Sequence, residues 1–347
     1  MQQSVAKPIS LALQGGGAHG AFTWGVMDRF LEDGRVRLAA ISGTSAGAMN
    51  AAVAASGLMK GGAEGARAAL ASFWRAISDA ARLSPIQRNP VDRFLGSWSL
   101  QNSPGFHFFD GLSRVISPYQ LNPLNLNPLK EVLEAHVDFE LVRACDQMRL
   151  FISATNVETG RIKLFNRRSL TADMVMASAC LPHIYQAVEI DGQHYWDGGY
   201  AGNPALYPLY EVGETKDIMI VQINPVSRPG VPTTAHDIQE RLNEITFNAP
   251  LLAEFRAIDF VRRMINDGVL QRGKYRKIRI HMIRDDPHLN PLGASSKLNA
   301  EWEFLEHLHG LGHSAASRWL DAHWDDLGSR PTFNIREAVR SRMPAAE

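Results

Sequence analysis

The strongest constraint on the fold is a pair of short apolar runs that each end in glycine. Ile9–Gln14 leads into Gly15-Gly16-Gly17, and Leu38–Ser42 leads into Gly43-Thr44-Ser45. The segment between them, Gly20–Asp33, carries apolar residues at helical spacing and stops before Gly34, a common helix end. Strand, helix and strand in this order predict a right-handed βαβ unit and therefore a mainly parallel sheet.

The remaining patterns extend this α/β arrangement along the chain. We expect strands at Leu150–Asn156, Arg161–Phe165 (pairing with it as a hairpin), Asp217–Asn224 and Lys277–Ile283, and helices at Ala46–Ser56, 61–83, Ala172–Cys180, Asp237–Asp267 and Ala300–Leu320. This pattern predicts an α/β domain over residues 8–226, followed by a mostly helical C-terminal extension over 227–347 that packs on it.

Residues 83–128 differ in character from the rest of the α/β region. They contain six prolines beside the aromatic residues Trp98, Phe106, Phe108, Phe109 and Tyr119. Proline prevents long regular structure, while the aromatic rings need cover. The segment is therefore either a lid or pocket wall over an apolar site, or a long connector packed on the sheet. Asn127-Pro128 fits the cap and first turn of the helix that follows.

Composition excludes some functions and indicates a compartment. The chain has 36 Lys plus Arg and 36 Asp plus Glu, so nothing supports a nucleic-acid partner, which requires a basic excess. Two cysteines without metal or redox spacing, Cys145 and Cys180, fit a reducing compartment. No apolar run is long enough for a secretory signal or a membrane span. We expect a cytoplasmic protein whose contact with a membrane is at most peripheral.

The first chemical motif is Gly43-Thr44-Ser45-Ala46-Gly47, which fits the G-x-S-x-G turn of serine hydrolases. Between a strand and a helix, flanking glycines allow a cramped turn that exposes the serine hydroxyl. The following helix would direct its N-terminal N–H groups and positive dipole end toward the reacting carbonyl. A glycine-rich buried turn without chemistry is the alternative interpretation.

The second motif is Gly15-Gly16-Gly17-Ala18-His19-Gly20, whose backbone N–H groups could converge on one point as an oxyanion hole. The same residues satisfy G-x-G-x-x-G, but a dinucleotide site would need an acidic residue at the end of the second strand. That strand ends at Ser42-Gly43 instead. A phosphate-binding P-loop is excluded because Ala21, and not Lys, follows Gly20.

The third motif is Asp197-Gly198-Gly199, which by itself predicts only a turn. A serine hydroxyl is a poor nucleophile unless a base takes its proton. If Asp197 lies within hydrogen-bond reach of Ser45, it can serve directly as that base without a histidine. We expect the two side chains to meet at the carboxyl ends of neighbouring strands.

Together, the three motifs resemble the patatin-like phospholipase family, over roughly Pro8 to Asn224. The resemblance implies a three-layer α/β/α sandwich and a Ser–Asp dyad in which Ser45 is the nucleophile and Asp197 the base. It also implies that Gly15, Gly16 and Gly17 form the oxyanion hole, with Gly20, Gly43, Gly47, Gly198 and Gly199 as supporting motif positions, and that neither calcium nor another cofactor is needed. Many members carry Arg or Lys where this chain has His19, which could line the pocket without charge.

The expected activity is therefore hydrolysis of phospholipids, lysophospholipids or related acyl esters; transfer of the acyl group to another acceptor would use the same residues. One alternative is an α/β-hydrolase triad completed by His194, His281 or His313. A non-catalytic lipid-binding protein on the same fold is another.

Two further groups of residues invite weaker interpretations. His307, His309 and His313 lie close together, but no third metal ligand is evident and glycines interrupt the helix, so we expect no metal site. The basic run Arg272–Arg279 fits a solvated strand edge, or a patch that docks on an anionic bilayer. The sequence gives no indication of oligomeric state.

Overall fold

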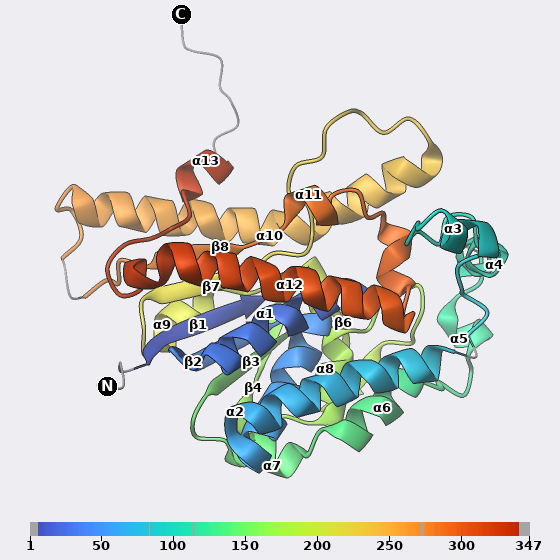
Figure 1. Cartoon of the computed structure of the whole chain (residues 1–347), viewed down its shortest axis with the longest axis horizontal. Helices are drawn as coiled ribbons and strands as arrows, with labels where there is room; N and C mark the ends of the chain where they lie inside the picture. Colours follow the sequence, from blue (N-terminus) through green and yellow to red (C-terminus); the bar gives the residue numbers. More distant parts are fainter. Residues whose placement is uncertain (1–5, 83, 114, 272–273, 340–347) are drawn as a thin grey trace, which may run out of the picture.

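One mixed sheet forms the centre of the molecule (Figure 1). The computed structural model describes residues 6–82, 84–113, 115–271 and 274–339. The strands are β1 Lys7–Leu13, β2 Val36–Gly43, β3 Arg149–Asn156, β4 Ile162–Asn166, β5 Val188–Ile190, β6 Gln193–Asp197, β7 Asp217–Val221 and β8 Arg279–Ile283. Their order is β5-β6-β3-β2-β1-β7-β8, and β4 also pairs with β3. Neighbouring strands are parallel from β3 across β2, β1 and β7 to β8. The pairs β3–β4, β3–β6 and β5–β6 are antiparallel, and the first of them confirms the expected hairpin.

Helices connect the strands in sequence order. The α-helices are α1 Gly20–Asp33, α2 Ala46–Ala81, α3 Pro90–Phe94, α4 Pro104–Ser113, α5 Pro118–Leu121, α6 Pro128–His136, α7 Phe139–Ala144, α8 Ala172–Ser178, α9 Tyr207–Val212, α10 Ala235–Asn266, α11 Asp286–Leu289, α12 Trp302–His323 and α13 Ile335–Val339. Short 3₁₀ helices are η1 Gly17–His19, η2 Arg167–Ser169, η3 Gly198–Tyr200, η4 Ala294–Leu298 and η5 Trp324–Asp326. Helix α2 joins the two helices expected at 46–56 and 61–83, with non-helical backbone at Gly61 and Gly62.

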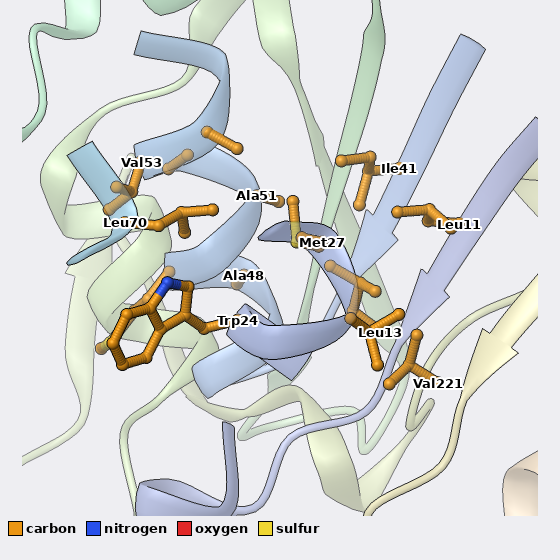
Figure 2. Packing of buried hydrophobic residues seen from close by; sticks show 14 of the residues in the cluster. Leu11, Leu13, Trp24, Met27, Ile41, Ala48, Ala51, Val53, Leu70 and Val221 are labelled. Atoms are coloured by element: carbon orange, nitrogen blue, oxygen red, sulfur yellow. The ribbon is translucent and has the colours of Figure 1, made fainter. Parts of the chain in front are cut away.

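Alternate residues of the central strands face two separate cores. Leu11 and Leu13 of β1 pack into the larger core with residues of α1, α2, α8 and α12, as Figure 2 shows for part of it. Ala12, between them, packs into the smaller core with residues of α9, α10 and α13. Because both faces of the sheet are covered by helices, the fold is a three-layer α/β/α sandwich, as expected.

The C-terminal region contributes to this sandwich directly. Strand β8 extends the sheet by pairing in parallel with β7, and helix α12 packs against α1. The division at residue 226 stays a prediction. Within the part of the chain that the structure describes, no helix is long and apolar enough to cross a bilayer.

Helices α1 and α12 approach closely through glycine. A methyl group at Gly312 would lie 2.0 Å from the Phe22 carbonyl oxygen, whereas one at Gly310, two residues earlier, would meet nothing within 4 Å. We therefore expect Gly312→Ala to lower the free energy of unfolding by about 1–3 kcal/mol through overpacking. Gly310→Ala should raise it by about 0.5–1 kcal/mol through helix propensity. Chemical denaturation measures both; equal effects of the two substitutions would contradict this account of the α1–α12 contact.

The segment expected at 83–128 forms the three short helices α3, α4 and α5; Leu83 and Arg114 lie outside the described residues. Its anchor is Arg88, which pairs with Glu301 at 2.6 Å and lies over the ring of Trp98. Trp98 in turn stacks on Phe304 of α12. Pro128 starts α6 as predicted, but Asn127 does not cap it, since its buried side-chain oxygen accepts no hydrogen bond from the described residues. Whether the segment is a lid stays a prediction.

Candidate active site

Ser45 occupies a sharp turn between β2 and α2. Its backbone has φ 54° and ψ −121°, a conformation that residues other than glycine rarely adopt. Its N–H donates a hydrogen bond to Ser178 Oγ at 2.8 Å. The turn packs closely against β1: a methyl group at Gly47 would lie only 2.4 Å from the Leu13 carbonyl oxygen. This strain and close packing are typical of a nucleophile elbow.

Asp197 is the last residue of β6, and β6 is not a neighbour of β2. Strand β3 lies between the two and runs antiparallel to β6, so the expectation that both residues end neighbouring strands at their carboxyl edge was wrong. On β3, Ile152 pairs with Gly43 of β2 and Ala154 pairs with Asp197 of β6, so the two pairing positions are only two residues apart. An antiparallel strand therefore brings the Asp-Gly-Gly turn to the level of the serine turn.

The Asp197 carboxyl group is buried, with 1% of the residue exposed. Oδ1 accepts a hydrogen bond from the Gly199 N–H at 2.7 Å, whereas Oδ2 is buried without a hydrogen bond of regular geometry among the described residues. Burial raises the pKa of Asp197 to about 7, although hydrogen bonding from Gly199 and the Ser45 side chain and the charge of Lys297 lower it. A carboxyl group whose pKa is near neutral pH can accept a proton from a serine hydroxyl that lies close to it.

The glycine loop lies against the serine turn. A methyl group at Gly15 would lie 2.6 Å from Ser45 Cβ, so only glycine allows this approach. The Gly15 N–H donates to Asn203 Oδ1 at 2.7 Å, and its carbonyl accepts from Asn224 Nδ2 at 2.7 Å. The N–H groups of Gly16 and Gly17 donate to none of the described residues, so these two, rather than Gly15, are free to bind an oxyanion.

The supporting glycines are required by close packing. A methyl group would lie within 2.6 Å of a neighbouring atom at each of these positions: Gly20 against Ala46, Gly43 against Gly47, Gly198 against Ser153, and Gly199 against Phe247. At Gly20, Gly43 and Gly198 a larger residue would require the backbone to move, and at Gly199 it would displace the Phe247 ring.

Several residues near the site were not predicted from sequence. Ser153 on β3 hydrogen-bonds Thr44 Oγ1 at 2.6 Å and packs on Gly198, so it contacts both the serine turn and the Asp-Gly-Gly turn. Helix α10 contributes Phe247, which covers Gly199, and Asn248, which binds the Gln14 side chain. These are common residue types far from the motifs, so no local pattern could have identified them.

His19 is packed and not charged. It is 2% exposed and hydrogen-bonds Ser296 Oγ at 2.8 Å, with its ring edge-on to Phe304. Burial and the nearby charge of Lys297 lower the pKa of His19 to about 3. The imidazole is therefore neutral at physiological pH and joins the loop to η4 and α12.

The histidines of the alternative triad bind other partners. His281 is on the edge strand β8 and hydrogen-bonds Asp217, and His313 pairs with Glu32 on α1. His194 is on β6, where it pairs with Glu189 of β5 and its carbonyl oxygen accepts from the Val157 N–H at 2.9 Å. None of the three hydrogen-bonds Ser45 or Asp197 in the described chain.

The other histidines and the basic run also have structural partners. His309 pairs with Asp28, and His307 stacks on Trp98. The described residues hold no group of three His, Cys, Asp or Glu placed to bind a metal ion. In the basic run, Arg272 lies outside the described residues, while Arg276 donates to the Gly213 carbonyl and Arg279 pairs with Asp217.

The site is nearly closed in this structure, since Ser45 is only 9% exposed. A cavity of about 330 Å³ lies elsewhere, between α9, α10 and the segment Lys274–Ile278, and another of about 240 Å³ lies beside β8 and α12. Neither contains Ser45 or Asp197.

Comparison with models of protein families gives a match over much of the chain. A family model described as Patatin-like phospholipase matches residues 11–210, more than half of the 347 residues. The comparison with curated proteins found no match.

Solved structures show more distant similarity. VipD from Legionella pneumophila is 15% identical, covering 92% of this chain and 67% of its own, with a TM-score of 0.42. ExoU of Pseudomonas aeruginosa, solved in complex with SpcU, is 15% identical over 91% of this chain and 53% of its own, with a TM-score of 0.32. A second structure, of the type III effector protein ExoU, is 16% identical over 92% of this chain and 54% of its own, with a TM-score of 0.35. The chain thus spans about half the length of the ExoU chains.

Proposed function

We propose that this chain, which belongs to the patatin-like phospholipase family, hydrolyses lipid acyl esters through a Ser45–Asp197 dyad. Ser45 is the nucleophile, Asp197 is the general base, and the N–H groups of Gly16 and Gly17 bind the oxyanion. The observation that carries the proposal is the buried Asp197 carboxyl group, whose pKa is raised to about 7 and whose Oδ2 has no regular hydrogen bond. A base that is poised near neutral pH and is free to accept a proton suits this role.

The proposed reaction has two half-reactions with the same groups. Ser45 Oγ attacks the ester carbonyl carbon while its proton moves to Asp197, and the amides of Gly16 and Gly17 bind the negative oxygen. The tetrahedral intermediate collapses, and the leaving alcohol takes the proton from Asp197. Water then loses a proton to Asp197 and attacks the acyl group on Ser45. The second collapse releases the carboxylic acid, and Asp197 returns the proton to Ser45.

The test of this function is a panel of phospholipids, lysophospholipids and short-chain esters. We expect the purified chain to release carboxylic acid from at least one lipid class, without added calcium. Prior treatment with a fluorophosphonate should stop this release and leave one adduct on the peptide that contains Ser45. No release from any substrate, together with no adduct, would contradict the proposal.

The pH dependence of the activity follows from the raised pKa of Asp197. Because the base must be ionised to accept a proton, kcat/KM should rise about tenfold per pH unit below pH 7 and level off above it. A pH profile with a soluble short-chain ester measures this. An acid limb with its midpoint near the ordinary carboxyl pKa of 3.8 would contradict the assignment of Asp197 as a buried base.

The surface that contacts a lipid assembly would be the apolar segment α3–α5. The exposed side chains of this segment, and of the residues that directly follow α5, include Val91, Phe94, Leu95, Phe108, Val115, Tyr119, Leu124 and Leu126. The segment adjoins the site, because Leu100 N–H donates to Ser295 of η4, and the next residue, Ser296, binds His19 in the glycine loop. Figure 1 shows α3–α5 at the end of the molecule toward which β1 runs.

Replacing exposed apolar residues of this segment should therefore separate lipid from soluble substrates. We expect the double variant Phe94→Asp and Phe108→Asp to hydrolyse phospholipid vesicles at least about tenfold more slowly, because partitioning of apolar surface into the bilayer is lost. Turnover of a soluble ester should stay within about twofold, and Val231→Asp, which is exposed outside the segment, serves as control. Equal losses on both substrates would contradict a docking role.

A further inference from the structure

A lysine from the C-terminal region lies against the glycine loop. Lys297 belongs to η4, and its carbonyl oxygen is so close to Gly17 that a methyl group there would lie 2.3 Å from it. Its Nζ donates a hydrogen bond to Asn224 Oδ1 at 2.8 Å. A cation is thus positioned beside the loop, although the loop's own residue His19 is neutral.

This lysine determines which way the Asn224 amide faces. An ammonium group only donates hydrogen bonds, so it must meet the amide oxygen and not the amide nitrogen. The Asn224 Nδ2 is therefore directed to the other side, where it donates to the Gly15 carbonyl at 2.7 Å and approaches Gln14 Oε1 at 3.3 Å. If the amide were reversed, two oxygens would face each other at Gly15.

The Gly15 carbonyl in turn determines the direction of the Gly16 N–H. The two groups belong to one planar trans peptide unit, in which C=O and N–H point in opposite directions. Holding the carbonyl toward Asn224 therefore holds the Gly16 N–H away from Asn224. Because glycines flank this unit, side-chain sterics do little to prevent its rotation, and the hydrogen bonds must fix it instead.

Building on the function proposed above, we propose that Lys297 is a positioning residue for the oxyanion hole. Through Asn224 it locks the Gly15–Gly16 peptide in the orientation that leaves the Gly16 N–H free for the oxyanion. The hydrolytic site thus depends on a residue about 250 positions after the nucleophile, in the region beyond residue 226.

The charge of Lys297 also acts on the base. The charged and titratable groups that face Lys297 are Glu240 and Glu244 of α10, Arg228, Asp197 of β6, and the neutral His19 of the loop. Loss of solvation lowers the pKa of Lys297, and its positive charge lowers the pKa of Asp197. Removing the charge should therefore move the acid limb of the pH–rate profile to higher pH.

The experiment compares Lys297→Met with Lys297→Arg on a soluble ester that the wild-type chain hydrolyses in a Ser45-dependent manner. Methionine keeps the unbranched side chain up to the ε position but has no donor, whereas arginine keeps a donor-only cation. We expect Lys297→Met to lower kcat by about 10- to 100-fold with little change in KM, which is less than the loss of an oxyanion donor because the Gly16 N–H remains and is only less well oriented. Lys297→Arg should recover most of the loss, and Lys60→Met, an exposed lysine of α2, should match the wild type.

A double-mutant cycle tests whether the effect passes through Asn224. Because both residues act on the same peptide, Lys297→Met should cost much less in an Asn224→Leu background than in the wild type. Thermal unfolding of each variant distinguishes a loss of kcat from a loss of folded protein. Where Lys297→Met is less stable, recovery of kcat in Lys297→Arg makes the same distinction. Wild-type kcat and an unshifted pH profile in Lys297→Met would overturn the positioning role while leaving the proposed function intact. A wild-type chain inert to esters and fluorophosphonate would overturn both.

Discussion

Ser45→Ala is expected to reduce ester hydrolysis by about 10⁴-fold or more, to the background rate of the assay. Without the hydroxyl no acyl-enzyme can form, and the oxyanion amides alone give only weak catalysis. The substitution should be tolerated structurally, since the bonds that hold the turn are made by the backbone N–H of Ser45 and by Thr44. Initial rates on a short-chain ester, with folding checked by circular dichroism, measure the effect.

Ser178→Ala is the matched control for this substitution. It removes a buried serine hydroxyl that accepts the Ser45 N–H but has no proposed role in bond making. We expect a loss much smaller than that of Ser45→Ala. If Ser45→Ala keeps wild-type turnover, the hydrolysis is carried out by other residues.

Asp197→Asn is expected to lower kcat/KM by about 10³-fold or more, because an amide cannot accept the serine proton. The variant should keep its fold, since the Asn oxygen can still accept the Gly199 N–H. It should also unfold at a higher temperature at pH 8. The folded-state pKa of Asp197 is raised, so stability falls as the pH rises from about 4 to about 7, and asparagine removes this cost.

His194→Ala and His313→Ala are the controls that separate a dyad from a triad. Both histidines lie outside hydrogen-bond contact with Ser45, and each should keep activity within about twofold of the wild type. Loss of activity in one of them, together with an active Asp197→Asn variant, would favour a Ser–Asp–His hydrolase. Thermal unfolding of all three variants identifies any that are merely destabilised.

The parts of the fold that sequence analysis predicted are those with local signals. Strand β1, helix α1 and the serine turn lie within about forty consecutive residues, and hydrophobic periodicity and glycine positions specify each of them. The three-layer arrangement was implied by the resemblance of the motifs, and the structure agrees with it, since strands such as β7 are apolar on both faces.

The parts that sequence analysis did not predict depend on long-range pairing. The position of β6 beside β3, antiparallel, is set by sheet register and not by the residues of β6 alone. Asn127 was expected to cap α6 because of its residue type, but its side chain makes no capping hydrogen bond. Lys297 and Asn224 meet the glycine loop only in the folded chain, so no spacing in the sequence could identify them.

The most direct test of the dyad is the rate at which a fluorophosphonate modifies the chain at pH 8, followed by intact mass and peptide mapping. This rate measures attack by the activated nucleophile and does not depend on which lipid the chain hydrolyses. We predict one adduct, on Ser45, and a rate about 10³-fold lower in Asp197→Asn but unchanged in His194→Ala. An adduct at another residue, or equally fast modification of Asp197→Asn, would contradict activation of Ser45 by Asp197.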